Sequence, residues 1–231
     1  METKHVGIVV FDDVEVLDFC GPFEVFSVTR LEETSRRQST SPFRVSLIAQ
    51  EQGVITATGG LRTLADFSFG NCPKLDILLV PGGWGTRTEI NNSILGEWLR
   101  VKASEVELLT SVCTGSVLLG KAGLLDGKRA TTHWKALDWF RQTCPHVHVV
   151  EDQHVVHENN ILTSAGISAG IDLALKVVAH YYGIEVAQRT ARHMEYFYEP
   201  NNRRRVEFEL GQIPEVRQDN SRLPIRESRP R

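Results

Sequence analysis

The order of hydrophobic and polar positions predicts alternating strands and helices. Short, continuous apolar runs are typical of strands that are buried on both faces, and they occur at residues 6–11, 43–49, 75–80, 106–112 and 161–164. Shorter strand-like runs lie at 54–58, 146–150 and 155–157. Helical spacing is found at residues 24–31, 90–104, 114–125, 134–142, 171–182 and 185–195. This alternation indicates an α/β fold, a mostly parallel sheet with helices on both faces.

Pro22, in the segment after the first predicted strand, affects where we expect Asp18 to lie. Pro22 suits the first turn of a helix, where its missing N–H has no partner in any case. We therefore expect the first helix to begin near Pro22 and Asp18 to lie in the loop that follows the first strand.

Composition narrows the class of protein. The 231 residues are 41% hydrophobic and 24% charged, which fits an ordinary globular chain. With 26 Lys and Arg against 29 Asp and Glu, the net charge of −3 argues against a protein that neutralises nucleic acid or anionic lipid. The apolar run at 7–11 is too short for a signal peptide, and no run approaches the ~20 residues of a membrane span. We expect a cytoplasmic protein with no nucleic-acid or membrane partner.

The last 32 residues differ from the rest. Residues 200–231 hold four of the nine prolines and eight arginines, with few large apolar side chains. The sequence thus predicts one α/β domain at 1–199 and an extended tail at 200–231 that lies on the domain or on a second subunit. An arginine-rich contact for an anionic partner is the alternative, which five interspersed acidic residues disfavour.

One cysteine stands out among the four. Cys20, Cys72, Cys113 and Cys144 form no C-x-x-C pair, so neither a zinc knuckle nor a thioredoxin motif is present. Cys113 follows the strand at 106–112 directly, and the small residues at 111 and 115 permit a sharp turn into a helix. This is the pattern of a nucleophile elbow. A sulfur that faces helix N-terminal amides favours the thiolate, so we predict that Cys113 is a thiolate nucleophile.

Other candidates follow other buried strands. Asp18 would lie in the crevice at the carboxyl ends of the strands, where an acid can move protons, although a helix cap or an exposed acid is the alternative. Glu24 is a weaker candidate because a solvated helix face suits it better. Gly82 and Gly83 would present unpaired amides that hold negative charge, or form a plain turn. His133 fits a hydrogen-bonded structural role, and the remaining histidines show no metal spacing.

Several motifs together resemble the ThiJ/PfpI superfamily, and most closely its isonitrile hydratase branch. They are Leu17-Asp18-Phe-Cys-Gly21-Pro22-Phe-Glu24, Pro81-Gly82-Gly83, Val112-Cys113-Thr114-Gly115, Ala130-Thr-Thr-His-Trp134 and Thr163-Ser-Ala-Gly-Ile-Ser-Ala-Gly-Ile-Asp172. The resemblance implies a flavodoxin-like sandwich, a homodimer, a small-molecule substrate and no cofactor or metal. It further implies a hydratase that converts an isonitrile to the N-substituted formamide through a covalent thioimidate. Cys113 would attack the isonitrile carbon, Asp18 would shuttle the proton and Thr114 would position the substrate.

Three alternatives stay open. The same cysteine could perform glyoxalase or other carbonyl chemistry. It could instead serve a redox or stress sensor through oxidation to a sulfenic or sulfinic acid. Similar domains also occur fused to helix-turn-helix modules, but residues 200–231 do not predict a helical DNA reader.

Overall fold

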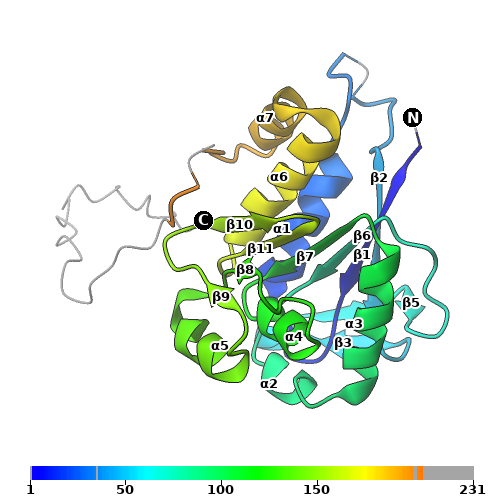
Figure 1. Cartoon of the computed structure of the whole chain (residues 1–231). Helices are drawn as coiled ribbons and strands as arrows, with labels where there is room; N and C mark the ends of the chain where they lie inside the picture. The colour runs from blue at the N-terminus through cyan, green and yellow to red at the C-terminus, as the bar shows by residue number, and fades with distance from the viewer. Residues whose placement is uncertain (1, 35, 200–201, 205–231) are drawn as a thin grey trace, which may run out of the picture.

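A seven-stranded sheet forms the centre of the protein in the computed structural model, which describes residues 2–34, 36–199 and 202–204 (Figure 1). The strand order is β10-β11-β7-β6-β1-β2-β5, and every pair is parallel except β10 with β11. The strands are β1 (Lys4–Val9), β2 (Phe43–Ala49), β5 (Phe67–Ser68), β6 (Ile77–Val80), β7 (Leu108–Val112), β10 (Val155–Glu158) and β11 (Ile161–Ser164). The chain runs from β1 outward to β2 and then returns to β6 on the other side of β1, so the strand order reverses between β1 and β6. Ligands of such sheets bind at that reversal, beyond the carboxyl ends of the strands.

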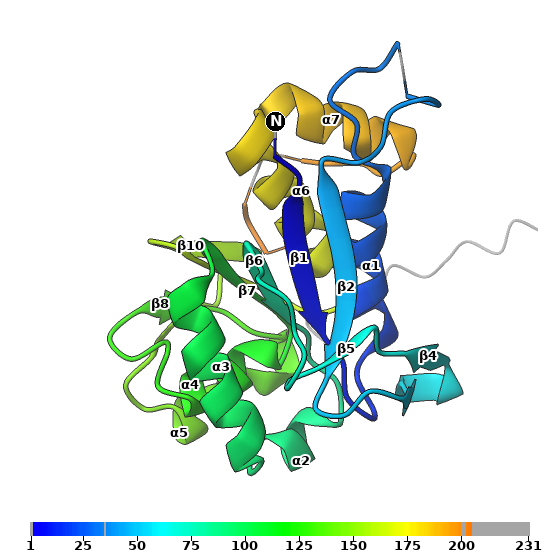
Figure 2. The ribbon, with the colours of Figure 1, turned by 90° about the vertical axis from the view of Figure 1, so that its right-hand side faces the viewer.

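Helices cover both faces of this sheet, as Figures 1 and 2 show. One face carries α1 (Val16–Val28), α6 (Ala169–Tyr182) and α7 (Ile184–His193). The other carries α3 (Ser93–Glu105) and α4 (Gly115–Lys121), with α2 (Thr86–Glu89) and α5 (Leu137–Thr143) packed against α4. The predicted flavodoxin-like α/β fold is confirmed. Because helices cover both faces, all residues of β6 and β7 are buried, which is why these strands are continuous apolar runs in the sequence.

In the described part of the chain, two small two-stranded sheets and two short helices lie outside the central sheet. A hairpin of β3 (Val54–Thr56) and β4 (Arg62–Leu64) encloses the short helix η1 (Thr58–Gly60), and β3 lies within the strand-like run predicted at 54–58. A second pair consists of β8 (Arg129–Ala130) and β9 (His148–Val149), and η2 (Trp134–Ala136) precedes α5. Across the described residues, none of the helices is both long and apolar enough to cross a bilayer.

Helix α1 begins earlier than predicted, and this changes the position of Asp18. The helix starts at Val16, Pro22 lies inside it, and Asp18 belongs to its first turn rather than to a loop. Pro22 removes one helical N–H donor, the one that would bond to the carbonyl of Asp18. The helix continues nonetheless because Phe19 and Phe26 are buried in the core on its inner face. Packing therefore outweighs the local cost of the proline.

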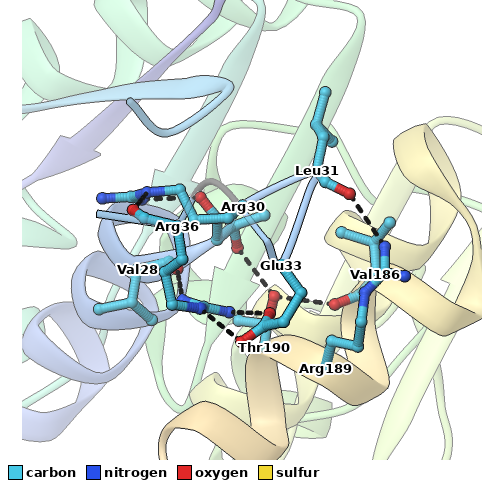
Figure 3. A network of polar contacts seen from close by, with 9 residues as sticks. Val28, Arg30, Leu31, Glu33, Arg36, Val186, Arg189 and Thr190 are labelled. Atoms are coloured by element: carbon cyan, nitrogen blue, oxygen red, sulfur yellow. Dashed lines mark hydrogen bonds and ion pairs between the residues drawn. The ribbon is translucent and has the colours of Figure 1, made fainter. Parts of the chain in front are cut away.

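Arginine side chains bind backbone carbonyls at and just after the end of α1, and one of them, Arg189, comes from α7 (Figure 3). Arg36 donates to the carbonyl of Val28 at 2.9 Å and forms an ion pair with Glu33. Arg189 of α7 donates to the carbonyl of Leu31 at 3.0 Å. Cations at a helix C-terminus satisfy carbonyls that have no helical partner and oppose the negative end of the helix dipole. The segment after α1 is thus fixed to α7 by side chains.

Residues 202–204 pair with the chain that leads into β10. Gln153 and Arg203 form an antiparallel bridge. The side chain of Asn202 accepts from the backbone N–H of Val155 at 3.0 Å and donates to the carbonyl of the same residue at 2.5 Å. This part of the predicted tail lies on the domain, and the rest of it, residues 200–201 and 205–231, lies outside the described residues.

Candidate functional site

Cys113 occupies a strained turn between β7 and α4. Its φ of 55° is in the left-handed region, which is uncommon for a residue other than glycine. Gly115 makes the turn possible, because a Cβ at that position would collide with the carbonyl oxygen of Val80. Hydrogen bonds to other segments hold the backbone of Cys113 in place: its N–H donates to the carbonyl of Ala165 at 3.1 Å, and its carbonyl accepts from the Thr132 hydroxyl at 2.8 Å. The predicted elbow is present.

Asp18 reaches the elbow from the first turn of α1 and is completely buried. Its two carboxyl oxygens accept from the backbone N–H groups of Gly82, at 2.9 Å, and Ile167, at 3.0 Å. Burial raises the pKa of Asp18 to about 7, and the nearby charge of Glu15 adds to the rise, while the two N–H donors oppose it. At neutral pH this carboxyl therefore exchanges a proton readily.

The surroundings of Cys113 favour a neutral thiol rather than the predicted thiolate. Its side chain is 7% exposed. Burial, followed by the charge of Asp18, raises the pKa of Cys113 well above the ordinary value of a thiol. The backbone and hydroxyl of Thr114 act in the opposite direction but are outweighed. The expectation of a resting thiolate is therefore wrong, because removal from water and a neighbouring carboxylate both disfavour a charged sulfur.

Gly82 and Gly83 lie beside the elbow, but their amides are not free as predicted. The N–H of Gly82 donates to Asp18, and that of Gly83 donates to the Thr114 hydroxyl oxygen at 3.1 Å. Gly82 also allows a close approach to the elbow, since a Cβ there would lie 2.5 Å from the backbone nitrogen of Thr114 and 2.9 Å from Cβ of Cys113. In this structure the two glycines hold the acid and the threonine in place.

Thr114 is the first residue after the cysteine and is buried. Its hydroxyl oxygen lies 3.1 Å from the hydroxyl oxygen of Thr86, whose own hydroxyl also reaches the Gly83 carbonyl at 2.7 Å. The Gly83 N–H donates to the Thr114 hydroxyl oxygen, and the Thr114 hydroxyl in turn faces the Gly83 carbonyl at 3.4 Å. The same hydroxyl also contacts the sulfur of Cys113, whose pKa it lowers. The structure therefore brings together the three residues predicted to be catalytic: Cys113, Asp18 and Thr114.

These groups open into a cavity of about 370 Å³. Cys113 and Thr114 form its inner end. Its other lining residues are Glu15, Gly83, Trp84, Arg87, His133, Trp134, Lys135, Ala136 and Ile167. This volume is sufficient for a small organic molecule.

Two further candidates have other surroundings. His133 lines the cavity, accepts from the N–H of Lys135 at 3.3 Å through Nδ1, and has a pKa that burial lowers. It fits the predicted structural role. Glu24 is exposed on α1 and does not line the cavity. Among the described residues, no group of three or more metal-binding side chains comes together.

Sequence reasoning missed several residues that shape the site. Thr132 stands in a quoted motif, yet nothing in the sequence showed that its hydroxyl would hold the Cys113 carbonyl. Thr86 and Glu15 had no motif of their own. A link from the C-terminus was also missed: the guanidinium of Arg204 donates to the Thr131 hydroxyl at 2.6 Å and to the Thr132 carbonyl at 3.0 Å.

Comparisons with known proteins find related sequences and a related fold. The family model described as the DJ-1/PfpI family matches residues 4–180. The isonitrile hydratase of Pseudomonas putida is 34% identical over 193 residues, which are 83% of this chain and 78% of that protein. The HTH-type transcriptional regulator CdhR of Pseudomonas aeruginosa is 31% identical over 79% of this chain, a match that spans only 49% of the regulator. A crystal structure of a ThiJ/PfpI family protein from Pseudomonas syringae has a TM-score of 0.74 at 28% identity, covering 87% of this chain and 78% of that one.

Proposed function

Because the chain belongs to the DJ-1/PfpI family, we propose that it hydrates an isonitrile to the N-substituted formamide with Cys113 as the nucleophile. The observation that carries the proposal is the partner of the cysteine. Asp18, with a pKa of about 7, lies close enough to Cys113 for each group to shift the pKa of the other. Hydration of an isonitrile requires attack by a nucleophile and then a proton at the same carbon. A carboxyl that titrates near neutral pH can act as the base for the nucleophile and then as the acid for the carbon. Similarity to the Pseudomonas putida isonitrile hydratase supports the choice of substrate.

In the first half of the reaction, Asp18 takes the thiol proton as the sulfur of Cys113 attacks the terminal isonitrile carbon. The C–S bond forms, and the carbon lone pair takes the proton back from Asp18. The product is a thioimidate, R–N=CH–S, attached to Cys113. Because the thiol is neutral at rest, the base is needed at the moment of attack, and no separate pool of thiolate is required.

In the second half, a water molecule adds to the thioimidate carbon. Asp18 removes a proton from the water and transfers it to the nitrogen. The tetrahedral intermediate then expels the Cys113 sulfur, which regains a proton from the hydroxyl group by way of Asp18, and R–NH–CHO is released. Thr114 positions the sulfur and the substrate throughout, since its hydroxyl lies beside Cys113 and lines the cavity.

The alternatives receive less support. A redox sensor needs a sulfur that is oxidised easily, and the raised pKa and burial of Cys113 disfavour this. Carbonyl chemistry at the same thiol stays a second candidate, and turnover of methylglyoxal separates it from isonitrile hydration. The similarity to a transcriptional regulator covers about half of that protein, and a regulatory role predicts ligand binding without turnover.

The test is formamide production from phenyl isonitrile, followed by absorbance. Wild-type protein turns over, whereas Cys113→Ala and Asp18→Ala lose at least about 100-fold in rate, as expected for a nucleophile and its acid-base partner. Cys72→Ala, at a half-buried cysteine outside the cavity, keeps the wild-type rate. Absence of wild-type turnover, or full activity in Cys113→Ala, rejects the proposal.

The proposal also includes a homodimer that acts in the cytoplasm without a cofactor. Sedimentation velocity gives the mass in solution, and activity after exhaustive dialysis against a chelator tests the need for a metal. A monomer that is active, or activity restored only by a dissociable group, contradicts these points.

A further inference from the structure

Two tryptophans, each with a cation near its ring, border the outer part of the cavity. We call Trp84, Arg87, Trp134 and Lys135 the cation–tryptophan rim. Trp84 is 65% exposed and Trp134 is 41% exposed, although both are large apolar side chains. Exposed aromatic groups around a cavity are a common sign of a binding site.

The guanidinium of Arg87 is stacked rather than paired. Its central carbon lies 4.2 Å from the ring centroid of Trp84 and 5.1 Å from that of Trp139. A guanidinium held by ring faces keeps its N–H groups at its edge, where they can bind a carboxylate with two parallel hydrogen bonds. The guanidinium of Arg87 forms no hydrogen bond or ion pair with any residue that the structure describes.

Lys135 repeats this arrangement at the second tryptophan. Its ammonium lies 5.0 Å from the ring centroid of Trp134. No carboxylate among the described residues lies within ion-pair distance of Lys135. The rim therefore offers two aromatic surfaces and two positive charges, and no carboxylate in the described part of the chain neutralises these charges.

The acidic groups lie at the other end of the cavity. Asp18 is buried next to Cys113, and Glu15 is close enough to raise the pKa of Asp18. Arg87 is exposed and follows the fully buried Thr86, which contacts Thr114, so the rim lies on the solvent side of the inner residues. The cavity thus has the buried carboxyl of Asp18 beside the sulfur and two cations at the rim, with Glu15 as a further acid in its lining.

We propose that this cavity selects an aromatic isonitrile that carries an anionic group, such as a carboxylate. The ring lies against the tryptophans, the anion binds Arg87 with support from Lys135, and the neutral isonitrile points inward to Cys113. The acids at the inner end repel the anion and so favour this orientation. The isonitrile group of this substrate is inferred from the proposed function, whereas its aromatic ring and its anionic group are inferred from the rim.

The experiment compares 4-isocyanobenzoate with its neutral analogue 4-isocyanobenzamide. We expect kcat/KM of wild-type protein to be about tenfold higher for the benzoate, as one charged bidentate contact predicts. Arg87→Gln reduces this preference to about onefold, and Arg87→Lys, which keeps the charge but loses the fork, restores part of it. Arg62→Gln, at an exposed arginine of β4 outside the cavity, keeps the full preference.

A second measurement is independent of turnover. Benzoate quenches the fluorescence of the rim tryptophans and slows alkylation of Cys113 by neutral iodoacetamide, as followed by peptide mapping. Benzylammonium, which has the same ring and the opposite charge, does neither at the same concentration.

The two proposals fail separately. If both substrates turn over equally, the anionic preference is wrong and the hydratase stands. If neither turns over but benzoate binds and protects Cys113, the rim binds an anionic aromatic ligand and the hydratase is wrong. If benzoate neither quenches nor protects and no substrate turns over, both are wrong.

Discussion

Replacement of Asp18 by asparagine changes how stability depends on pH. The folded protein holds this carboxyl at a pKa of about 7, against about 3.9 in an unfolded chain. A folded-state pKa that is raised means that folding favours the protonated acid, so this contribution to stability is complete below pH 4 and is lost as the pH rises to 7. The asparagine in Asp18→Asn does not titrate, so the stability of this variant lacks the pH-dependent contribution of the buried acid.

The size of the effect follows from the shift. Three pKa units correspond to roughly 4 kcal/mol over the full range, and between pH 5 and pH 8 the linkage relation gives about 2.5 kcal/mol. Asparagine also loses one of the two backbone hydrogen bonds to Gly82 and Ile167, at about 1–2 kcal/mol. That loss is similar at both pH values and largely cancels in the comparison.

The assay is urea unfolding at pH 5 and pH 8 in the presence of reductant. From pH 5 to pH 8, the free energy of unfolding of Asp18→Asn is expected to rise by about 2.5 kcal/mol relative to wild type. The control is Asp138→Asn, the same substitution at a carboxyl that is 88% exposed, and no comparable change is expected there. An equal difference between Asp18→Asn and wild type at both pH values would refute the account of this buried acid.

Three further predictions concern the surroundings of the site. Gly82→Ala places a methyl group 2.5 Å from a backbone nitrogen and lowers the free energy of unfolding by about 1–3 kcal/mol. Gly96→Ala, in the interior of helix α3, places its methyl group 3.9 Å from the Arg100 side chain and raises the free energy of unfolding by up to about 1 kcal/mol. Thermal unfolding of the two variants checks both signs. The pH profile of kcat/KM rises through about 7 as Asp18 ionises, and Glu15→Gln moves its midpoint lower because a negative charge is removed; an unchanged midpoint contradicts this. Arg204→Gln removes two hydrogen bonds to the 131–132 backbone and hydroxyl, so amide exchange there becomes faster, while exchange in β2 does not change.

The sheet was predictable from sequence because its strands are buried on both faces. The bounds of β2 and β11 match the prediction, and β7 and β6 differ from it by two residues at one end. The α2 helix was missed, since its four residues, TRTE, have no apolar periodicity and follow a segment with three glycines, Gly82, Gly83 and Gly85. Local patterns describe an element well when its burial is uniform, and poorly when a tertiary contact decides its start, as it does for α1.

The site was predictable as a set of residues but not as a state of charge. The elbow pattern identified Cys113, and the topology placed Asp18 near it. The protonation of the thiol depends on how much water packing removes and on which residue faces the sulfur, and neither is encoded near residue 113. In the same way, the glycine amides were expected to be free because their partners, Asp18 and Thr114, come from other segments of the chain.

The pairing of residues 202–204 with the chain before β10 protects the sheet from aggregation. As the outermost strand, β10 would otherwise present backbone groups of Val155 that another polypeptide could bind as a template. Asn202 occupies these groups with one side-chain amide, so three residues shield the start of this edge without forming a regular strand. Chains that stop at residue 199 keep the buried core yet expose this edge, and are therefore expected to form filaments or precipitate at concentrations where the full chain does not.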